Sequence, residues 1–245
     1  MADRAMKAFL DTIRIILIET SHPGNIGSVA RAMKTMGLKQ LYLVNPVCFP
    51  HPKANELASS AVDIIEQAVL TETLDQALSD CHLIIGTSTR SRTIPWPMLS
   101  PRDLALKIQA QPDGAQTAIL FGREQSGLTN DELHRCHFHV QIPANPEYSS
   151  LNIAAAVQVV AYEIYLASLK KSASHAWDYP MATHQEMEGF YAHLEKVLVN
   201  LEFLNPKAPR QLMTRLRRLF ARAQPDAMEI NILRGILGSV EKKPE

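Results

Sequence analysis

The stretch of sequence that decides the fold is Ile13-Arg-Ile-Ile-Leu-Ile-Glu-Thr-Ser-His-Pro-Gly-Asn-Ile-Gly-Ser-Val-Ala-Arg31. Its first part, residues 13–19, is an apolar run rich in β-branched side chains, which predicts a buried strand. The turn residues Pro23 and Gly24 end that run. The residues after them predict a helix that ends at Gly37, which suits a left-handed C-terminal cap.

Short apolar runs of the same kind recur between helix-like segments, at residues 41–45, 82–86, 117–121 and 138–142. Continuous apolar strands that alternate with helices are typical of a parallel sheet that is covered on both faces. The sequence therefore predicts an α/β fold with a parallel sheet and helices on both faces.

A further helix is expected from Ser149 onward, with a serine cap and an apolar surface nearly all round. Such a helix has to be buried or to form an interface. Residues 170–180 are polar and without periodicity, which indicates a linker, and residues 181–245 read as helices only. We therefore expect an α/β domain at 1–169, the linker, and a small all-helical domain at 181–245.

The composition is that of a globular protein. With 245 residues, of which 46% are hydrophobic, the chain is long enough to bury a sizeable core. The formal net charge is +0, so the total charge does not require a polyanionic partner, although basic residues concentrate after residue 170. No run approaches the ~20 apolar residues of a membrane span, and we expect a cytoplasmic protein without a membrane partner.

Cysteines and histidines give no indication of a disulfide or a metal site. The three cysteines, Cys48, Cys81 and Cys136, lie far apart in the sequence and predict reduced thiols. In the segment 134–139, His137 and His139 fall on one face at strand period, and no carboxylate or second cysteine stands at ligand spacing. We expect structural roles for these histidines and no bound metal.

Loops at the carboxyl ends of parallel strands line the ligand crevice, so they are the first place to search for function. The first such loop places Asn25 at the expected helix start, where it would cap the helix, and Arg31 about two turns in. The second loop brings hydroxyls and two arginines, Arg90 and Arg92, directly behind a strand. On these residues alone, an ordinary cap, a surface arginine and a solvated turn remain open.

The third loop is Phe121-Gly-Arg-Glu-Gln-Ser-Gly-Leu128, in which Gly122 permits close approach of a ligand and Arg123 stands beside Glu124. The fourth runs from Ile142 to Asn152, is braced by prolines and ends at a helix start. Both loops offer groups that bind a polar ligand, although a charge pair alone is usually structural.

Taken in order, the four loops resemble the SPOUT superfamily, and within it the ribose 2′-O-methyltransferases of transfer and ribosomal RNA. The matching residues are Asn25 with Arg31, then Phe121-Gly-x-Glu124-x-x-Gly127-Leu128, then Ile142-Pro143 with Ser150-Leu-Asn152. Residues 19–34, 92–98 and 145–152 look more narrowly like the bacterial enzymes that methylate the ribose of nucleotide 32 in the tRNA anticodon loop.

This resemblance implies a deep trefoil knot in the C-terminal part of the α/β domain, an exception to the rule that chains do not thread loops. It also implies a homodimer, a tRNA substrate and S-adenosylmethionine as the methyl donor. The cofactor contacts that it implies are Thr87, Ser88, Thr89, Gly122, Ile142, Ser149, Ser150 and Leu151. One departure is the loop Asn145-Pro-Glu-Tyr148, where the wider family commonly has a glycine.

The resemblance gives the central catalytic role to Arg31, with Asn25, Glu124 and Ser150 completing the pocket. Because a guanidinium stays protonated in proteins, we expect Arg31 to bind the phosphate beside the target ribose and to orient the hydroxyl, with the phosphate sharing in proton removal. A literal base is the other possibility.

Basic residues predict the RNA contacts. Arg215, Arg218 and Arg222 line one side of an expected helix, in a region with no acidic residue between positions 203 and 225. The simpler interpretation is a solvated charged face, but the absence of acids favours an RNA-binding stripe. Near the strand ends, Arg90, Arg92 and Arg123 are the further candidates.

Three other functions remain open on the sequence. Gly24-x-x-Gly27 behind a strand suggests a nucleotide-binding oxidoreductase, although the third glycine of that fingerprint and a ribose-binding acid are missing. The protein could also be a methyltransferase that acts on another tRNA or rRNA nucleotide, or an inactive RNA-binding module.

Overall fold

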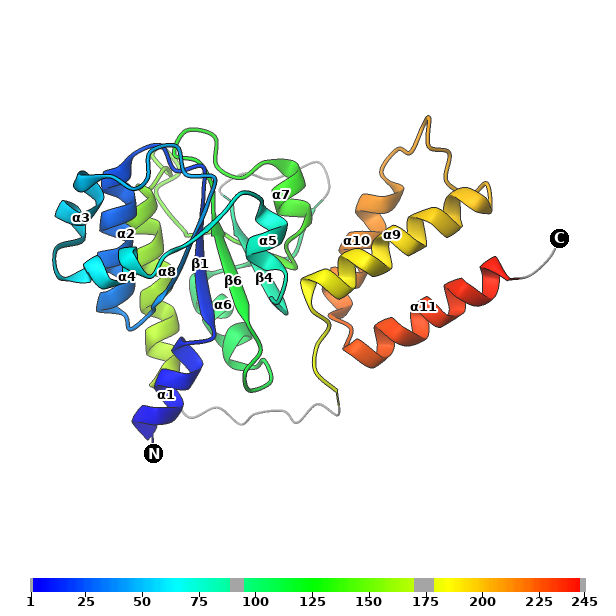
Figure 1. Ribbon diagram of the computed structural model, residues 1–245, viewed down its shortest axis with the longest axis horizontal. Helices are drawn as coiled ribbons and strands as arrows, with labels where there is room; N and C mark the ends of the chain where they lie inside the picture. Colours follow the sequence, from blue (N-terminus) through cyan, green and yellow to red (C-terminus); the bar gives the residue numbers. More distant parts are fainter. Residues whose placement is uncertain (1, 89–94, 170–178, 243–245) are drawn as a thin grey trace.

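The computed structural model describes residues 2–88, 95–169 and 179–242, with side chains from residue 6 onward. The sheet has seven parallel strands in the order β3-β2-β1-β6-β4-β7-β5. Figure 1 shows β1, β6 and β4 side by side in this sheet. The strands are β1 (Ile13–Ile18), β2 (Gln40–Val44), β3 (Val69–Thr71), β4 (Leu83–Thr87), β5 (Met98–Leu99), β6 (Thr117–Phe121) and β7 (Phe138–Val140).

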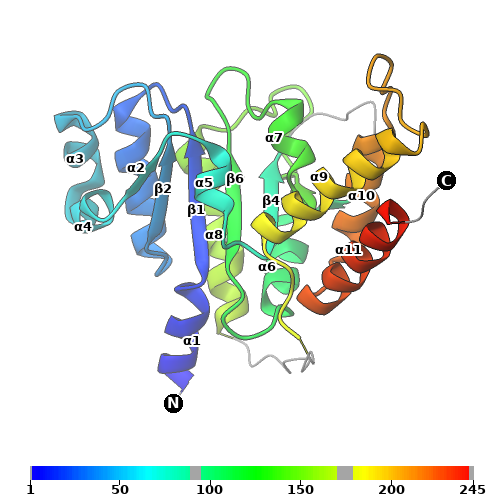
Figure 2. The same cartoon turned by 45° about the vertical axis from the view of Figure 1, so that its right-hand side comes forward.

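Helices cover both faces of this sheet, as predicted (Figure 2). The helices are α1 (Ala2–Leu10), α2 (Pro23–Thr35), α3 (Pro52–Ala58), α4 (Val62–Glu66), α5 (Leu74–Leu78), α6 (Pro101–Gln109), α7 (Asn130–His134) and α8 (Ile153–Ser168). Helices α2, α6 and α8 pack on one face, and α5 and α7 pack on the other. No helix in the described part of the chain is long and apolar enough to cross a membrane.

Strand β1 shows why its sequence forms the middle of the sheet. Ile15 belongs to the hydrophobic cluster on one face and Ile16 to the cluster on the other, because successive side chains of a strand point to opposite faces. The one charged residue of the strand, Arg14, is 3% exposed and donates to Asp80 at 2.8 and 3.0 Å. Its guanidinium also stacks on Tyr42, which makes a buried charge tolerable at this position.

All five predicted strands are present within one or two residues of their predicted ends. Two strands were missed, β3 and β5. Both are edge strands of two or three residues, and residues such as Val69 and Met98 in them are exposed. They are too short to show an apolar period in the sequence.

The structure corrects two predicted caps. The N-cap of α2 is His22, with Pro23 as the first helical residue, and Asn25 lies within the first turn. The N-cap of α8 is Asn152 instead of a serine, and its side chain accepts from the backbone N–H of Ala154 at 2.9 Å. In contrast, Gly37 has a φ of 74°, as its place after α2 predicted.

Beyond the sheet, α9 (His184–Asn200), α10 (Leu212–Ala223) and α11 (Ala227–Glu241) form a helical region with its own hydrophobic cluster around Phe190 (Figures 1 and 2). The region contacts the sheet region at the start of α9, where the backbone N–H of His184 donates to the carbonyl of Cys81 at 2.8 Å. Of the linker predicted at 170–180, residues 170–178 lie outside the described residues.

Candidate active site

The loops that follow β1, β6, β4 and β7 meet at the edge of the sheet that is formed by the carboxyl ends of its strands. They meet there because these four strands are consecutive neighbours and all parallel. The four motif-bearing loops predicted from the sequence are the loops behind these strands. The sheet order therefore brings together residues that lie more than a hundred positions apart in the chain.

Glu124, behind β6, is the centre of the hydrogen-bond network at this edge. Its carboxylate accepts from the amide Nδ2 of Asn25 at 3.0 Å and from the backbone N–H groups of Ser21 at 3.2 Å and His22 at 3.3 Å. The hydroxyl of Ser21 adds a fourth contact at 3.1 Å. The carboxylate thus sits at the N-terminus of α2, where a negative charge is favourable.

These contacts fix the charge of Glu124. Partial burial alone would raise the pKa of this carboxyl, but the hydrogen bonds from Asn25 and from the backbone lower it to about 2. Glu124 is therefore an anion at neutral pH, and it acts as an acceptor only.

Asn25 links this network to the loop before α8. Its Oδ1 accepts from the amide Nδ2 of Asn152 at 3.1 Å, while its own Nδ2 donates to Glu124. Both the nitrogen and the oxygen of the Asn25 amide are therefore hydrogen-bonded. Through these two bonds Asn25 connects the start of α2 to the loop after β6 and to the start of α8.

Arg31 lies further along α2, and its side chain is exposed. Within the described residues its guanidinium has no ion pair or hydrogen-bond partner. Arg31 is therefore available to an external anion. Ser150 is also exposed and stands two residues before Asn152, so the structure brings its segment to the network without joining the side chain to it.

Within the described residues, the predicted cofactor contacts lie at the end of β4 and on the loops behind β4, β6 and β7. The hydroxyl of Thr87 donates to the carbonyl of Leu120 at 2.9 Å, and the backbone N–H of Ser88 donates to the carbonyl of Val140 at 3.0 Å. Both bonds hold the end of β4 between its two neighbours. Thr89 lies outside the described residues.

The remaining cofactor contacts combine backbone groups with apolar side chains. Residues 149–151 are exposed, Leu151 among them, and Ile142 is half-buried. At Gly122 an added Cβ would lie 2.2 Å from the carbonyl carbon of Gly127, so only glycine lets this loop fold back so tightly. Exposed loop backbone beside apolar side chains is what an adenosine moiety requires, so the residues present fit such a ligand.

The predicted RNA contacts have different surroundings. Arg90 and Arg92 lie outside the described residues. Arg123 binds Glu19 and Glu132, and Arg218 donates to the backbone carbonyl of Pro95 at 3.0 Å. Exposed positions on α10 are occupied by Arg215 and Arg222.

The two glycines that suggested an oxidoreductase have a packing role. At Gly27 an added Cβ would lie 2.1 Å from the backbone carbonyl oxygen of Ala54, and at Gly24 it would lie 2.7 Å from the side chain of Leu57. Glycine at these positions lets α2 approach α3 closely. This explains the Gly-x-x-Gly spacing without a dinucleotide.

The histidines of segment 134–139 are held by protein groups. His137 Nδ1 accepts from the backbone N–H of Ile84 at 3.0 Å, and burial lowers the pKa of this imidazole to about 4. His139 stacks on Trp96. In residues 2–88, 95–169 and 179–242, no group of three metal-ligating side chains is placed to hold an ion.

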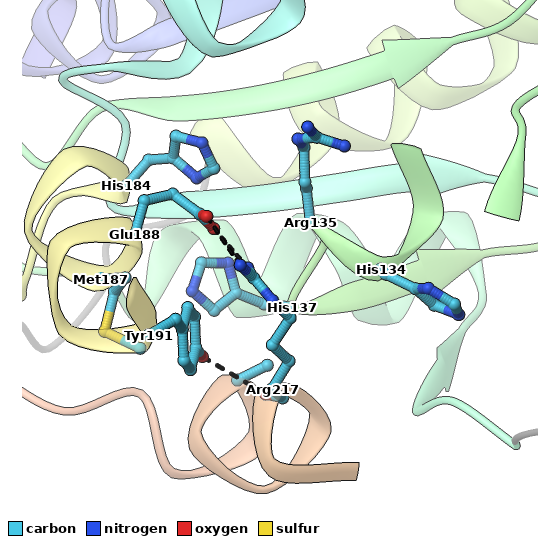
Figure 3. Close-up of a pocket in the computed structure, with 9 residues that line it drawn as sticks. His134, Arg135, His137, His184, Met187, Glu188, Tyr191 and Arg217 are labelled. Carbon is cyan, nitrogen blue, oxygen red and sulfur yellow. Dashed lines mark hydrogen bonds and ion pairs between the residues drawn. The ribbon is translucent and has the colours of Figure 1, made fainter. Parts of the chain in front are cut away.

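A pocket between the sheet region and the helical region is separate from this edge (Figure 3). Glu188 and Arg217 face each other across it, with 2.8 Å between Oε2 and Nη2, and the guanidinium stacks on Tyr191. His184 Nε2 lies 3.1 Å from a carboxylate oxygen of Asp75. Its charged side chains are already paired, Glu188 with Arg217 and Arg135 with Asp75, so we assign this pocket to the contact between the two regions.

The sequence interpretation missed two residues that the structure makes central. Asn152 was quoted only as part of a motif, and its dual role as cap and partner of Asn25 was not predicted. Glu19 was treated as a strand residue, although it has a φ of 47° and binds Arg123. An asparagine just before an apolar helix is a cap signal that could have identified the first.

Comparison with known proteins agrees with this geometry. The model of the SpoU rRNA Methylase family matches residues 12–162, and the model of the tRNA methyltransferase TrmJ C-terminal domain matches residues 185–245. The chain belongs to the SpoU methylase family.

The individual relatives are more specific. A protein of Pectobacterium atrosepticum named tRNA (cytidine/uridine-2'-O-)-methyltransferase TrmJ is 55% identical over 236 residues, which cover 95% of this chain and 98% of the relative. Its namesake from Cronobacter sakazakii is 54% identical over 95% of this chain and 97% of its own length. The crystal structure of TrmJ from Z. mobilis ZM4 is 35% identical, with a TM-score of 0.82 over 94% of this chain and 99% of that one.

Proposed function

We propose that this protein transfers a methyl group from S-adenosylmethionine to the ribose 2′-hydroxyl of cytidine or uridine at nucleotide 32 of the tRNA anticodon loop. The observation that carries the proposal is the network in which Asn25 binds Glu124 at 3.0 Å and Asn152 at 3.1 Å. It joins the three motifs of the resemblance at one edge of the sheet. The names of the relatives supply the substrate class.

S-adenosylmethionine supplies a methyl group on a positively charged sulfur, and the chain has to align an oxygen nucleophile with it. The loops behind β4, β6 and β7 would hold this cofactor through their backbone groups and through the apolar side chains of Ile142 and Leu151. The residues that we assign to it are Thr87, Ser88, Thr89, Gly122, Ile142, Ser149, Ser150 and Leu151.

The side chains around the network position the ribose. Arg31 is exposed and has no partner within the described residues, so it can bind the phosphate next to the target ribose and orient the hydroxyl. Because a guanidinium stays protonated, the proton of the hydroxyl passes to the phosphate or to water. Asn25, Glu124 and Ser150 complete the pocket.

A homodimer through α8 is part of the proposal. One side of α8 is buried against the sheet, with Val157 and Ile164 fully covered. The other side exposes an apolar stripe in the single chain. Its members are Ala155, Val159 and Tyr162 on α8 and Leu169 at its C-cap. A stripe with spacings of three, four and seven residues suits packing against a second helix, and a second copy of α8 supplies one.

The trefoil knot, the division into domains and the cellular location belong to the proposal as well. Strands β6 and β7 come late in the sequence, yet β6 lies between β1 and β4 and β7 lies between β4 and β5, which supports the trefoil knot. The separate hydrophobic cluster of α9 and α11 supports the division into domains at 1–169 and 181–245, with a linker at 170–180. A tRNA substrate would place the protein in the cytoplasm.

The test of the function is mass spectrometry of tRNA from cells with and without this gene. We expect the ribose methyl at nucleotide 32 to disappear from the deleted strain and to return when the purified protein and S-adenosylmethionine are added to that tRNA. A methyl lost at another nucleotide would select the alternative substrate. Unchanged tRNA in both experiments would leave an RNA-binding module as the answer.

A further inference from the structure

Arg123 lies beside Glu124 and makes two double hydrogen bonds with one guanidinium. Its Nε and Nη2 donate to the carboxylate of Glu19 at 2.8 and 2.7 Å. Its Nη1 and Nη2 donate to the carboxylate of Glu132, both at 3.1 Å. The side chain of Arg123 is 23% exposed, that of Glu132 12% and that of Glu19 40%. The contact with Glu132 is therefore the better shielded from water, and hydrogen bonds between charged groups are strong.

The two carboxylates belong to different parts of the site. Glu19 follows β1 and leads into the loop whose backbone binds Glu124. Glu132 is the third residue of α7 and also accepts from the backbone N–H of Thr129 at 2.7 Å. Arg123 therefore connects the loop after β1 to the start of α7.

The backbone of Arg123 closes the loop that carries Glu124. The N–H of Arg123 donates to the carbonyl of Gly127 at 3.2 Å, and the N–H of Gly127 donates back at 2.9 Å. Three residues form the tip between these bonds, and Glu124 is the first of them. The direction in which Glu124 points thus depends on how Arg123 is held.

We propose that Arg123 is a positioning residue for methyl transfer, whose guanidinium holds the loop of Glu124 against the start of α2 by binding Glu19 and Glu132 together. This inference rests on the proposed function of the same site. It assigns Arg123 to the protein scaffold, whereas the sequence predicted an RNA contact. The planar guanidinium makes four hydrogen bonds to the two carboxylates, and a lysine ammonium, with three N–H donors, cannot make all four.

The test compares Arg123→Gln and Arg123→Lys with the wild-type protein in methyl transfer to tRNA. A displaced Glu124 and Asn25 should lower kcat by about 10- to 100-fold in both variants, because small misplacements of reacting groups are costly. The Kd for tRNA and its salt dependence should stay within about twofold of the wild type, since the phosphate contacts are kept.

Lys39→Gln is the matched control. Lys39 forms a surface ion pair with Asp11 at 3.0 Å, just before β2 begins and so at the opposite edge of the sheet. It should leave kcat unchanged. If Arg123→Gln does not fold, Glu19→Gln keeps the shape of the partner, removes its charge and should show the same loss of kcat with unchanged tRNA affinity.

Three results would overturn the inference. The first is an unchanged kcat in the folded variants. The second is weaker tRNA binding with a shallower salt dependence, which marks an RNA contact. Hydrogen exchange of residues 19–25 and 122–129 gives a readout that needs no turnover. Equal protection in Arg123→Gln and wild type also contradicts it. A wild-type protein that transfers no methyl would instead contradict the proposed function.

Discussion

Arg31 and Glu124 show how the surroundings of a side chain define its chemical role. Arg31 is exposed and unpaired among the described residues, so its charge is available to an external anion. The carboxylate of Glu124 is enclosed by four donors from Ser21, His22 and Asn25. We therefore expect Arg31 to bind the substrate, and Glu124 to hold the protein in the shape that binding requires.

At Arg31 we expect both Arg31→Ala and Arg31→Lys to lose methyl transfer almost completely. The alanine variant removes the charge, and the lysine variant removes the planar fork that binds phosphate in two places. Calorimetry should find S-adenosylmethionine binding nearly intact in both. Substantial residual turnover in Arg31→Ala would show that the arginine is not central.

Glu124 predicts a pH dependence of stability. Its pKa in the folded protein is about 2, below the ordinary value of 4.5, so the carboxylate stabilises the fold at pH values above about 4.5. That stabilisation is lost as the pH falls from about 4.5 towards 2. The difference in Tm between wild type and Glu124→Gln should therefore be largest at neutral pH and shrink over this range.

The matched control for this measurement is Glu66→Gln, which removes one exposed carboxylate outside the network. A Tm difference for Glu124→Gln that is absent at pH 7, or that persists unchanged at pH 2, would contradict the role given to its hydrogen bonds.

At the scale of elements, the position of α2 depends on its contact with α3. Gly27 allows this contact, since an added Cβ would lie 2.1 Å from the backbone oxygen of Ala54. Gly27→Ala should lower the free energy of unfolding by about 1–3 kcal/mol, because α2 has to move away from α3. Denaturant unfolding measures the change.

Gly235→Ala is the control for the Gly27 variant. Gly235 also lies within a helix, α11, and nothing would lie within 4 Å of its added Cβ. This variant should be neutral or stabilised by about 0.5–1 kcal/mol, because alanine is the better helix former. Equal stability of Gly27→Ala and wild type would show that α2 does not need this close approach.

Helix α2 is held by close packing, whereas helix α10 presents basic side chains to the solvent. Arg215 and Arg222 are exposed and form no ion pair within the described residues, whereas Arg217 is paired with Glu188. The double variant Arg215→Gln/Arg222→Gln should weaken tRNA binding. The slope of the logarithm of the binding constant against the logarithm of the salt concentration should become shallower by about one to two. Filter binding at several salt concentrations measures both.

Lys196→Gln serves as the control on the same helical region, because Lys196 is exposed and pairs with Glu241 at 2.9 Å. It should leave tRNA binding unchanged. If the α10 variant also binds tRNA as the wild type does, the arginines form an ordinary solvated face.

At the scale of the whole molecule, the apolar stripe on α8 predicts the oligomeric state. Tyr162→Glu places a charge in the middle of the stripe, and a carboxylate buried in an apolar interface without a partner costs several kcal/mol. Sedimentation velocity should find the wild type as a dimer and this variant as a monomer. Leu70→Glu, on the exposed edge strand β3, is the control and should remain dimeric. A monomeric wild type would exclude the interface.

The sequence by itself determined the class of fold and the motifs. The strands that it predicted are buried and long enough for an apolar run to be visible, and the loops behind them contain the residues on which the resemblance rests. It failed for β3 and β5, which are short edge strands, and for the caps of α2 and α8. Several residues at a helix start can act as a cap, and only the direction of the incoming chain selects one.

Only the tertiary structure decided which side chains act together. The network contains Glu124, Asn25 and Asn152, which meet because β6 is inserted beside β1. The order of strands in a sheet cannot be predicted from the local sequence of each strand. The same holds for Arg123, whose neighbours in the chain do not indicate that it binds Glu19 and Glu132. Hydrophobic periodicity is a local property that the sequence displays, whereas the pairing of distant polar groups depends on the packing of the whole sheet.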